Sequence, residues 1–143
     1  APDYGYSTTL EDPPYSLVDV TADSGGIMQP NSLRSIPEVR DGTSNTVLLT
    51  EDAGRPGNWQ MGRLVNASSQ TDGGWADADN AYISHGARPD GSADLGPCPM
   101  SCHNRNEPYS FHGGGGVGHA MADGSVRFTS TSMSIRVFVK LLT

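Results

Sequence analysis

Residues 111–128, FHGGGGVGHAMADGSVRF, decide the fold of this chain. They comprise a glycine-rich segment, a short strand, an Asp-Gly pair and a second strand. The pair Asp123-Gly124 between two strand-like runs is typical of a type I′ turn, because that turn requires a positive φ at both central residues. The sequence therefore predicts an antiparallel hairpin that closes at Asp123 and Gly124.

A two-residue turn also fixes which side chains oppose one another. It places Met121 opposite Val126 and His119 opposite Phe128. These four residues would share one face of the hairpin, which is apolar apart from His119. We therefore expect this face to cover a hydrophobic core.

The composition indicates a single, loop-rich globular domain. The chain has 143 residues, of which 35% are hydrophobic, with 18 glycines and 10 prolines. We expect residues 1–143 to form one domain, with residues 1–32 as an extended arm on residues 33–143. The net charge is −7 and the basic residues are scattered, which argues against nucleic acid as a partner, since its binding calls for a basic patch.

No segment approaches the ~18 apolar residues that a membrane span needs. The sequence starts at Ala1 without an initiator methionine or a signal peptide, so we interpret it as the processed product of a longer precursor.

Two segments of the first half carry clear secondary-structure signals. Ser35 and Glu38 match a capping box and Gly42 follows, which predicts one or two helical turns over residues 36–41. Residues 46–50, TVLLT, form the most apolar, β-branched run of this half and predict a central strand.

The second half combines a long excursion with an ambiguous end. Residues 52–110 are dominated by Gly, Pro, Asp, Asn and Ser and predict a long ordered excursion, with one short strand at residues 61–65. Residues 132–143 leave two alternatives. Alternation at every second residue suits a strand, whereas four apolar residues at i, i+3, i+4 and i+7 suit a helix with Ser132 or Ser134 as N-cap. The four are Ile135, Phe138, Val139 and Leu142.

The two cysteines lie in the segment Gly-Pro-Cys-Pro-Met-Ser-Cys-His. Two prolines and the lack of helical periodicity favour a loop disulfide between Cys98 and Cys102. The alternatives are a metal site with two thiolates and His103, or two free thiols. Zinc is disfavoured because structural zinc sites usually have four ligands and closer cysteine spacing.

Six segments together resemble successive parts of one protein family: residues 36–46, 51–56, 74–80, 96–102, 106–112 and 122–128. The family is the large set of prepilin-like proteins, abundant in planctomycetes, with a C-terminal domain of unknown function and a processing-associated motif of His, nine residues, then Asp-Gly. In this chain ten residues separate His112 from Asp123, and His119 stands where the family usually has an aliphatic strand residue.

The resemblance implies an α+β fold with a pseudopilin-like layout, in which a small antiparallel sheet packs with a helix and long ordered loops, and a C-terminal helix closes the domain. It also implies a location outside the cytoplasm, at the cell surface or in a filament. The partners would be copies of the chain itself or other subunits of a surface assembly. The membrane would be reached only through the family's N-terminal helix, which this sequence lacks. No enzymatic activity is established for the family.

An acidic segment is a candidate calcium site. Asp77, Asp79 and Asn80 offer the hard oxygen ligands that Ca²⁺ prefers. The same side chains also form Asx turns and caps, and we give that interpretation more weight. Any cofactor would thus be a structural Ca²⁺.

The motif residues His112, Asp123 and Gly124 allow several interpretations. His112 could be a metal ligand, a base or a structural hydrogen-bond donor, and Asp123 with Glu107 could complete a triad-like set. The sequence has no nucleophile elbow and no other catalytic signature, so we favour a structural role and assign no catalytic residue.

Two tryptophans are the large apolar side chains of the excursion. Trp59 and Trp75 could form a stacking platform for a sugar beside the acidic segment, although such residues more often anchor a long loop. Two functions therefore remain. We favour a non-enzymatic, extracellular structural or assembly protein, and the alternative is a calcium-dependent carbohydrate- or ligand-binding module.

Overall fold

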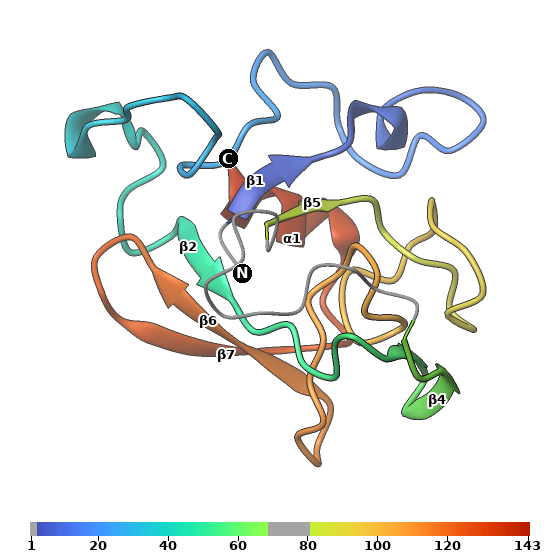
Figure 1. Cartoon of the computed structure of the whole chain (residues 1–143). Coiled ribbons are helices and arrows are strands. Elements are labelled where there is room, and N and C mark those ends of the chain that lie inside the picture. Colours follow the sequence, from blue (N-terminus) through green and yellow to red (C-terminus); the bar gives the residue numbers. More distant parts are fainter. Residues whose placement is uncertain (1–2, 69–80) are drawn as a thin grey trace.

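The structure is a computed structural model that describes residues 3–68 and 81–143 (Figure 1). Within these residues the chain is of mixed α+β character and consists mostly of strands and loops, with one α-helix. The strands form three small sheets, with the orders β2-β6-β7, β1-β5 and β3-β4. The strands are β1 (Asp3–Tyr6), β2 (Val47–Thr50), β3 (Asn58–Gln60), β4 (Arg63–Asn66), β5 (Tyr82–Ser84), β6 (Gly116–Met121) and β7 (Val126–Ser130), and the helix is α1 (Ile135–Leu142).

The C-terminal segment is the helix α1, so the helical alternative is confirmed. Ser134 is its N-cap residue. The four buried residues of α1 are the four at i, i+3, i+4 and i+7 that the sequence singled out: Ile135, Phe138, Val139 and Leu142. A helix of eight residues is marginal alone, so packing of this apolar face stabilises it.

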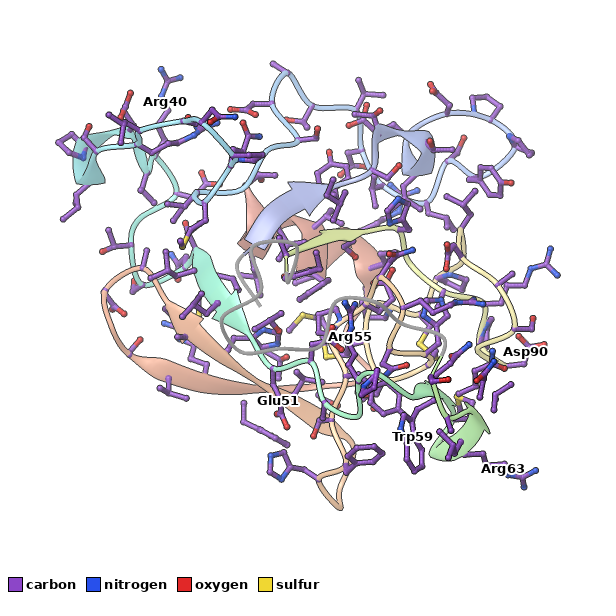
Figure 2. The ribbon with its side chains drawn as sticks, viewed as in Figure 1. Arg40, Glu51, Arg55, Trp59, Arg63 and Asp90 are labelled. Atoms are coloured by element: carbon purple, nitrogen blue, oxygen red, sulfur yellow. A yellow bond between two sulfur atoms is a disulfide. The ribbon has the colours of Figure 1, made fainter. Side chains whose placement is uncertain are left out.

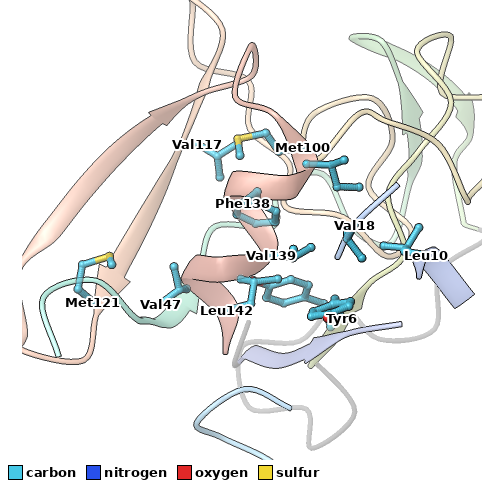
Figure 3. Packing of buried hydrophobic residues seen from close by; sticks show 12 residues of the cluster. Tyr6, Leu10, Val18, Val47, Met100, Val117, Met121, Phe138, Val139 and Leu142 are labelled. Carbon is cyan, nitrogen blue, oxygen red and sulfur yellow. The ribbon is translucent and has the colours of Figure 1, made fainter. Parts of the chain in front are cut away.

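The hydrophobic core lies around α1, as Figure 3 shows. Phe138 and Leu142 are fully buried and pack with Val47 of β2 and with Val117 and Met121 of β6. The N-terminal part of the chain also contributes to this core, through Tyr6, Leu10 and Val18. The helix is thereby held between the three-stranded sheet and the β1-β5 pair.

The β6-β7 hairpin forms, but its predicted type I′ turn is wrong. Ala120 lies opposite Val126, and Gly124 alone of the turn residues has a positive φ, of 83°. The N–H of Gly124 donates to the Met121 carbonyl at 3.0 Å, and the N–H of Met121 donates to the Ser125 carbonyl at 2.8 Å. The loop therefore has three residues and ends in a left-handed glycine, the second common hairpin type.

The additional loop residue shifts the register by one position. His119 lies opposite Arg127 instead of Phe128, which itself lies opposite Gly118. A one-residue shift moves every side chain of a strand to the other face. Val126 and Phe128 therefore point away from the core and are 78% and 58% exposed, contrary to the prediction.

Two other predicted elements form, but differ from the prediction in sheet position or helix type. β2 occupies the predicted run but is an edge strand, and β6 is central. The predicted helix over residues 36–41 is a single 3-10 turn, Ile36–Glu38, with the expected capping box of Ser35 and Glu38. A second 3-10 turn spans Thr8–Leu10.

A type I′ turn does occur, at the β3-β4 hairpin. Gln60 lies opposite Arg63, and the two residues between them, Met61 and Gly62, have φ values of 48° and 77°. The sequence predicted one strand across residues 61–65, whereas the first two of these residues form the turn. The signal was weak because methionine rarely adopts a positive φ.

Among the described residues, no helix has the length and apolar character of a membrane span.

Candidate interaction surface

The outer face of the β2-β6-β7 sheet carries apolar side chains that nothing in the described structure covers. Leu49, Ala120 and Val126 form one row across the three strands. Leu49 is 40% exposed and Val126 is 78% exposed. We call this side, together with Phe128, the open sheet face. Contiguous apolar surface of this kind is typical of an interaction site, whereas single exposed apolar residues are ordinary.

Glycines in β6 shape this face. A Cβ added to Gly116 would collide with the Phe128 ring and would lie 2.6 Å from the Thr129 carbonyl oxygen. The bare backbone of Gly116 therefore allows the Phe128 ring to lie directly over the strand. Glycine inside a strand often marks such a close approach.

His112 joins the open sheet face from the glycine-rich segment. Its Nε2 lies 3.4 Å from Glu51 Oε1, and its ring makes an edge contact with Phe128 at 5.7 Å between centroids. Glu51 Oε2 in turn accepts the N–H of Gly118 at 3.2 Å. His112 is therefore held at the edge of this surface by the Glu51 carboxylate and the Phe128 ring. Figure 2 shows the position of Glu51.

The motif residues His112 and Asp123 lie at opposite ends of β6. His112 precedes the strand and contacts Glu51 and Phe128, whereas Asp123 lies in the turn that follows it. Asp123 Oδ1 accepts the N–H of Ser125 at 2.9 Å, and hydrogen bonds from Ser125 lower the pKa of the Asp123 carboxyl. Asp123 and Gly124 thus shape the turn, and the motif does not assemble a triad.

Glu107 is buried elsewhere, in the loop region. Its Oε2 accepts the Ser84 hydroxyl and its Oε1 accepts the N–H of His85, both at 2.8 Å. Burial raises the pKa of Glu107 well above its ordinary value, against the effect of these hydrogen bonds. Its contacts are those of a structural group that connects β5 to the loop.

His103 and Asp94 form a second buried contact, with 2.8 Å between His103 Nε2 and Asp94 Oδ1. Burial, with the nearby Arg105 guanidinium, lowers the pKa of His103 to about 4, although Asp94 acts in the opposite direction. The N–H of Arg105 donates to His103 Nδ1 at 3.3 Å. The lowered pKa makes the His103 ring neutral at pH 7, so its contact with Asp94 is not an ion pair there.

Arg55 and Asn104 hold the start of the excursion in place. Arg55 Nε lies 2.8 Å from Asp52 Oδ2, and both side chains are only 4% exposed. Asn104 accepts the Trp59 N–H at 2.8 Å and donates to the Gly57 carbonyl at 2.9 Å. Sequence reasoning missed these residues, because no local spacing links position 55 to position 104.

His119, the unusual histidine of β6, is fully buried beside Phe138. Its Nδ1 lies 2.9 Å from the Thr50 hydroxyl and its Nε2 lies 2.7 Å from the Thr129 hydroxyl. Burial lowers the pKa of His119 to about 4. The ring is therefore neutral at pH 7 and connects β2 to β7 across the inner face of the sheet.

Trp59 belongs to an aromatic group in which Tyr109 is buried and Phe111 is half-exposed. Its ring meets Phe111 edge-on at 4.7 Å, and Phe111 meets Tyr109 at 5.5 Å. Trp59 Nε1 donates to the Gly54 carbonyl at 3.1 Å, which fixes the indole (Figure 2). Trp75, the other proposed stacking residue, lies outside the described residues.

The metal and disulfide predictions have different outcomes. The Cys98–Cys102 disulfide is confirmed, with 6.4 Å between the two Cα atoms. The proposed calcium ligands Asp77, Asp79 and Asn80 lie outside the described residues. Within residues 3–68 and 81–143, no group of three or more His, Cys, Asp or Glu side chains could hold a metal ion.

Comparison with known proteins gives one match. The sequence profile of a family described as "Protein of unknown function (DUF1559)" matches residues 3–135. No curated protein and no solved structure is significantly similar to the chain.

Proposed function

The chain belongs to the DUF1559 family of proteins of unknown function, and we propose that it is a non-enzymatic structural subunit of an extracellular or cell-surface assembly. The proposal includes a pseudopilin-like layout and the prepilin-like, planctomycete-type relation suggested by the sequence motifs. The observation that carries it is the open sheet face. Leu49, Val126 and Phe128 expose apolar surface from a sheet whose other face is already covered by α1.

The polar side chains of the described region favour an architectural role. Glu107, His103 and His119 are buried and hydrogen-bonded to groups of the fold itself. Catalytic groups instead need access to a substrate and a partner aligned for proton transfer. The exposed His112 contacts a carboxylate and an aromatic ring on the open sheet face.

The disulfide supports the proposed location. Bridges such as Cys98–Cys102 form and persist in oxidising compartments, outside the cytoplasm. In this proposal the partners are further copies of the chain or other subunits of the same assembly, without nucleic acid. Attachment to the membrane would depend on an N-terminal helix of the prepilin type.

A surface substitution tests the proposal. The source cells would produce the full protein carrying Val126→Lys, with Leu33→Lys as the matched control, because Leu33 is 99% exposed and lies away from the sheet. Gently extracted cell-surface material would be separated by size-exclusion chromatography. The wild type and the Leu33 variant should elute as part of a large complex, whereas the Val126 variant should elute as the free protein. A wild-type protein that is recovered only as a free monomer contradicts the proposal.

A calcium-dependent ligand-binding module remains the second candidate. The contact between the partly buried Trp59 and the 53% exposed Phe111 favours it, because sugars stack on aromatic rings. Thermal unfolding with and without a chelator tests this alternative, since a bound structural Ca²⁺ raises the midpoint. This alternative is rejected if the chelator leaves the midpoint unchanged and if the protein shows no glycan binding that Trp59→Ala weakens.

A further inference from the structure

β7 is an edge strand, and its backbone direction can be deduced from the hydrogen bonds at both ends of the hairpin. The N–H of Met121 bonds to the Ser125 carbonyl, and the N–H of Thr131 bonds to the Gly115 carbonyl. In an antiparallel pair, hydrogen-bonded positions alternate with positions whose backbone groups point away. Arg127 and Thr129 therefore bond to β6, whereas Val126, Phe128 and Ser130 direct their N–H and C=O groups outward.

The neighbouring strand agrees with this assignment. The N–H of Glu51, beside β2, bonds to the Gly118 carbonyl at 3.0 Å. Gly118 lies opposite Phe128, so its backbone groups turn toward β2 and leave those of Phe128 free of β6. The outward groups of β7 are consequently a template for a further strand.

β7 has few of the usual protections of an edge. It carries one charged side chain, Arg127, but no proline or lysine, and its pairing with β6 has no bulge. Within the described residues, the one bond to its outward groups is from the Met133 N–H to the Ser130 carbonyl, at 3.0 Å. No described residue bonds to the N–H or C=O of Phe128, at the centre of the strand.

We propose that β7 pairs with β7 of a second copy of this chain, antiparallel and about a two-fold axis, with Phe128 opposite Phe128. This inference rests on the proposed assembly function and specifies one of its contacts. In this register the two Phe128 residues exchange both backbone hydrogen bonds, and Val126 lies opposite Ser130. The two open sheet faces then join into one continuous apolar surface.

Charge selects this register among its neighbours. Shifting the second strand by two residues in one direction places Arg127 directly opposite Arg127 of the second copy, and like charges there are destabilising. Shifting it by two residues in the other direction leaves Val126 without a partner on β7. The Phe128-centred register places Arg127 opposite Thr129 and therefore avoids both problems.

The contact is small, so the isolated dimer is weak. A five-residue strand edge buries less than the ~1,000 Å² that a stable interface needs, so we expect a Kd of about 10⁻⁵ to 10⁻³ M. A weak contact of this kind suits an assembly in which many copies are held close together.

Amide hydrogen exchange at several protein concentrations tests the pairing. The outward amides of Val126, Phe128 and Ser130 should exchange fast at low concentration and gain about two- to fifteenfold protection near 1 mM, because a Kd of about 10⁻³ to 10⁻⁵ M leaves roughly half to one fifteenth of the chains monomeric. The inward amides of Arg127 and Thr129 are internal controls and should be protected throughout. Sedimentation velocity on the same samples should show the matching shift from monomer to dimer.

Phe128→Pro supplies the decisive variant. It removes an outward N–H that has no partner in β6, and an edge position of this kind tolerates proline. Phe128→Ala is the matched control, because it removes the ring and keeps the N–H. The proline variant should remain monomeric near 1 mM, while the alanine variant should dimerise more weakly than the wild type. Protected inward amides verify that both variants are folded.

The outcomes separate this inference from the proposed function. A chain that stays monomeric near 1 mM with unprotected outward amides overturns the β7 pairing. This holds even if Val126→Lys releases the protein from a surface complex, because that result would support the proposed function alone. A dimer that the proline variant leaves intact also overturns it. A β7 dimer of a protein that is found free in its source cells would instead contradict the proposed function alone.

Discussion

The two faces of the β2-β6-β7 sheet are built from the same strands and have opposite environments. On the inner face, Val117, His119 and Met121 of β6 are almost fully buried under α1. On the outer face, Val126 and Phe128 of β7 are more than half exposed. Apolar residues thus occur on both faces, and among the described residues only the inner face is covered. The inner face therefore contributes the burial that stabilises the fold, and the outer face is the surface that the proposed assembly would use.

The largest expected effect is the removal of the Phe138 ring from the core. Phe138→Ala should lower the free energy of unfolding by about 3–5 kcal/mol, because it leaves a cavity between α1 and the sheet. Chemical denaturation measures the change. Val137→Ala, at the half-exposed position next to it, is the control and should change stability little. A loss below about 1 kcal/mol for Phe138→Ala would contradict the assigned core.

Acid should weaken the inner face through His119. Its pKa is about 4 in the fold against 6.5 for an exposed histidine, so the unfolded chain binds more protons between these pH values. Stability contributed by the neutral ring is therefore present above pH 6.5 and is lost as the pH falls toward 4, by roughly 3 kcal/mol.

The control for this prediction is His119→Gln, which keeps hydrogen-bonding capacity toward Thr50 and Thr129 but does not titrate. Denaturation at pH 7 and pH 4.5 should show a larger loss for the wild type than for the variant. His103 shifts in the same direction in both proteins, so its effect cancels in the comparison. Equal losses would show that His119 does not carry the pH dependence.

A smaller effect is expected from Gly116→Ala, at the position in β6 over which the Phe128 ring lies. The added methyl group would collide with the Phe128 ring and the Thr129 carbonyl, so we expect a loss of about 1–3 kcal/mol. The double variant with Phe128→Ala should recover part of this loss, since the backbone collision remains. Thermal unfolding of the four proteins in this cycle measures the coupling. Strictly additive losses would mean that the ring does not lie over Gly116.

The smallest expected effect on stability is that of Val126→Thr on the open sheet face. Threonine keeps the β-branched shape, and the site is 78% exposed, so the free energy of unfolding should change by less than about 0.5 kcal/mol. A loss comparable to that of Phe138→Ala would remove the distinction between the two faces.

Local patterns predicted the parts of the fold that depend on neighbours in sequence. The helix α1 follows from the spacing of Ile135, Phe138, Val139 and Leu142, and the capping box at Ser35 follows from a three-residue interval. The disulfide is equally local, since only three residues separate its cysteines. The buried polar contacts were not predictable in this way, because Arg55 and Asn104 are far apart in the chain.

The sequence by itself determined that residues 111–128 form a hairpin and that the chain ends in an amphipathic helix, because both depend on local periodicity and turn residues. Only the tertiary structure decided the register of that hairpin. A two-residue and a three-residue loop are both compatible with Ala122-Asp123-Gly124, and the fold adopts the one that lets His119 meet Thr50 and Thr129. That single-residue difference moves Val126 and Phe128 from the core to the open sheet face, since alternate residues of a strand point to opposite sides.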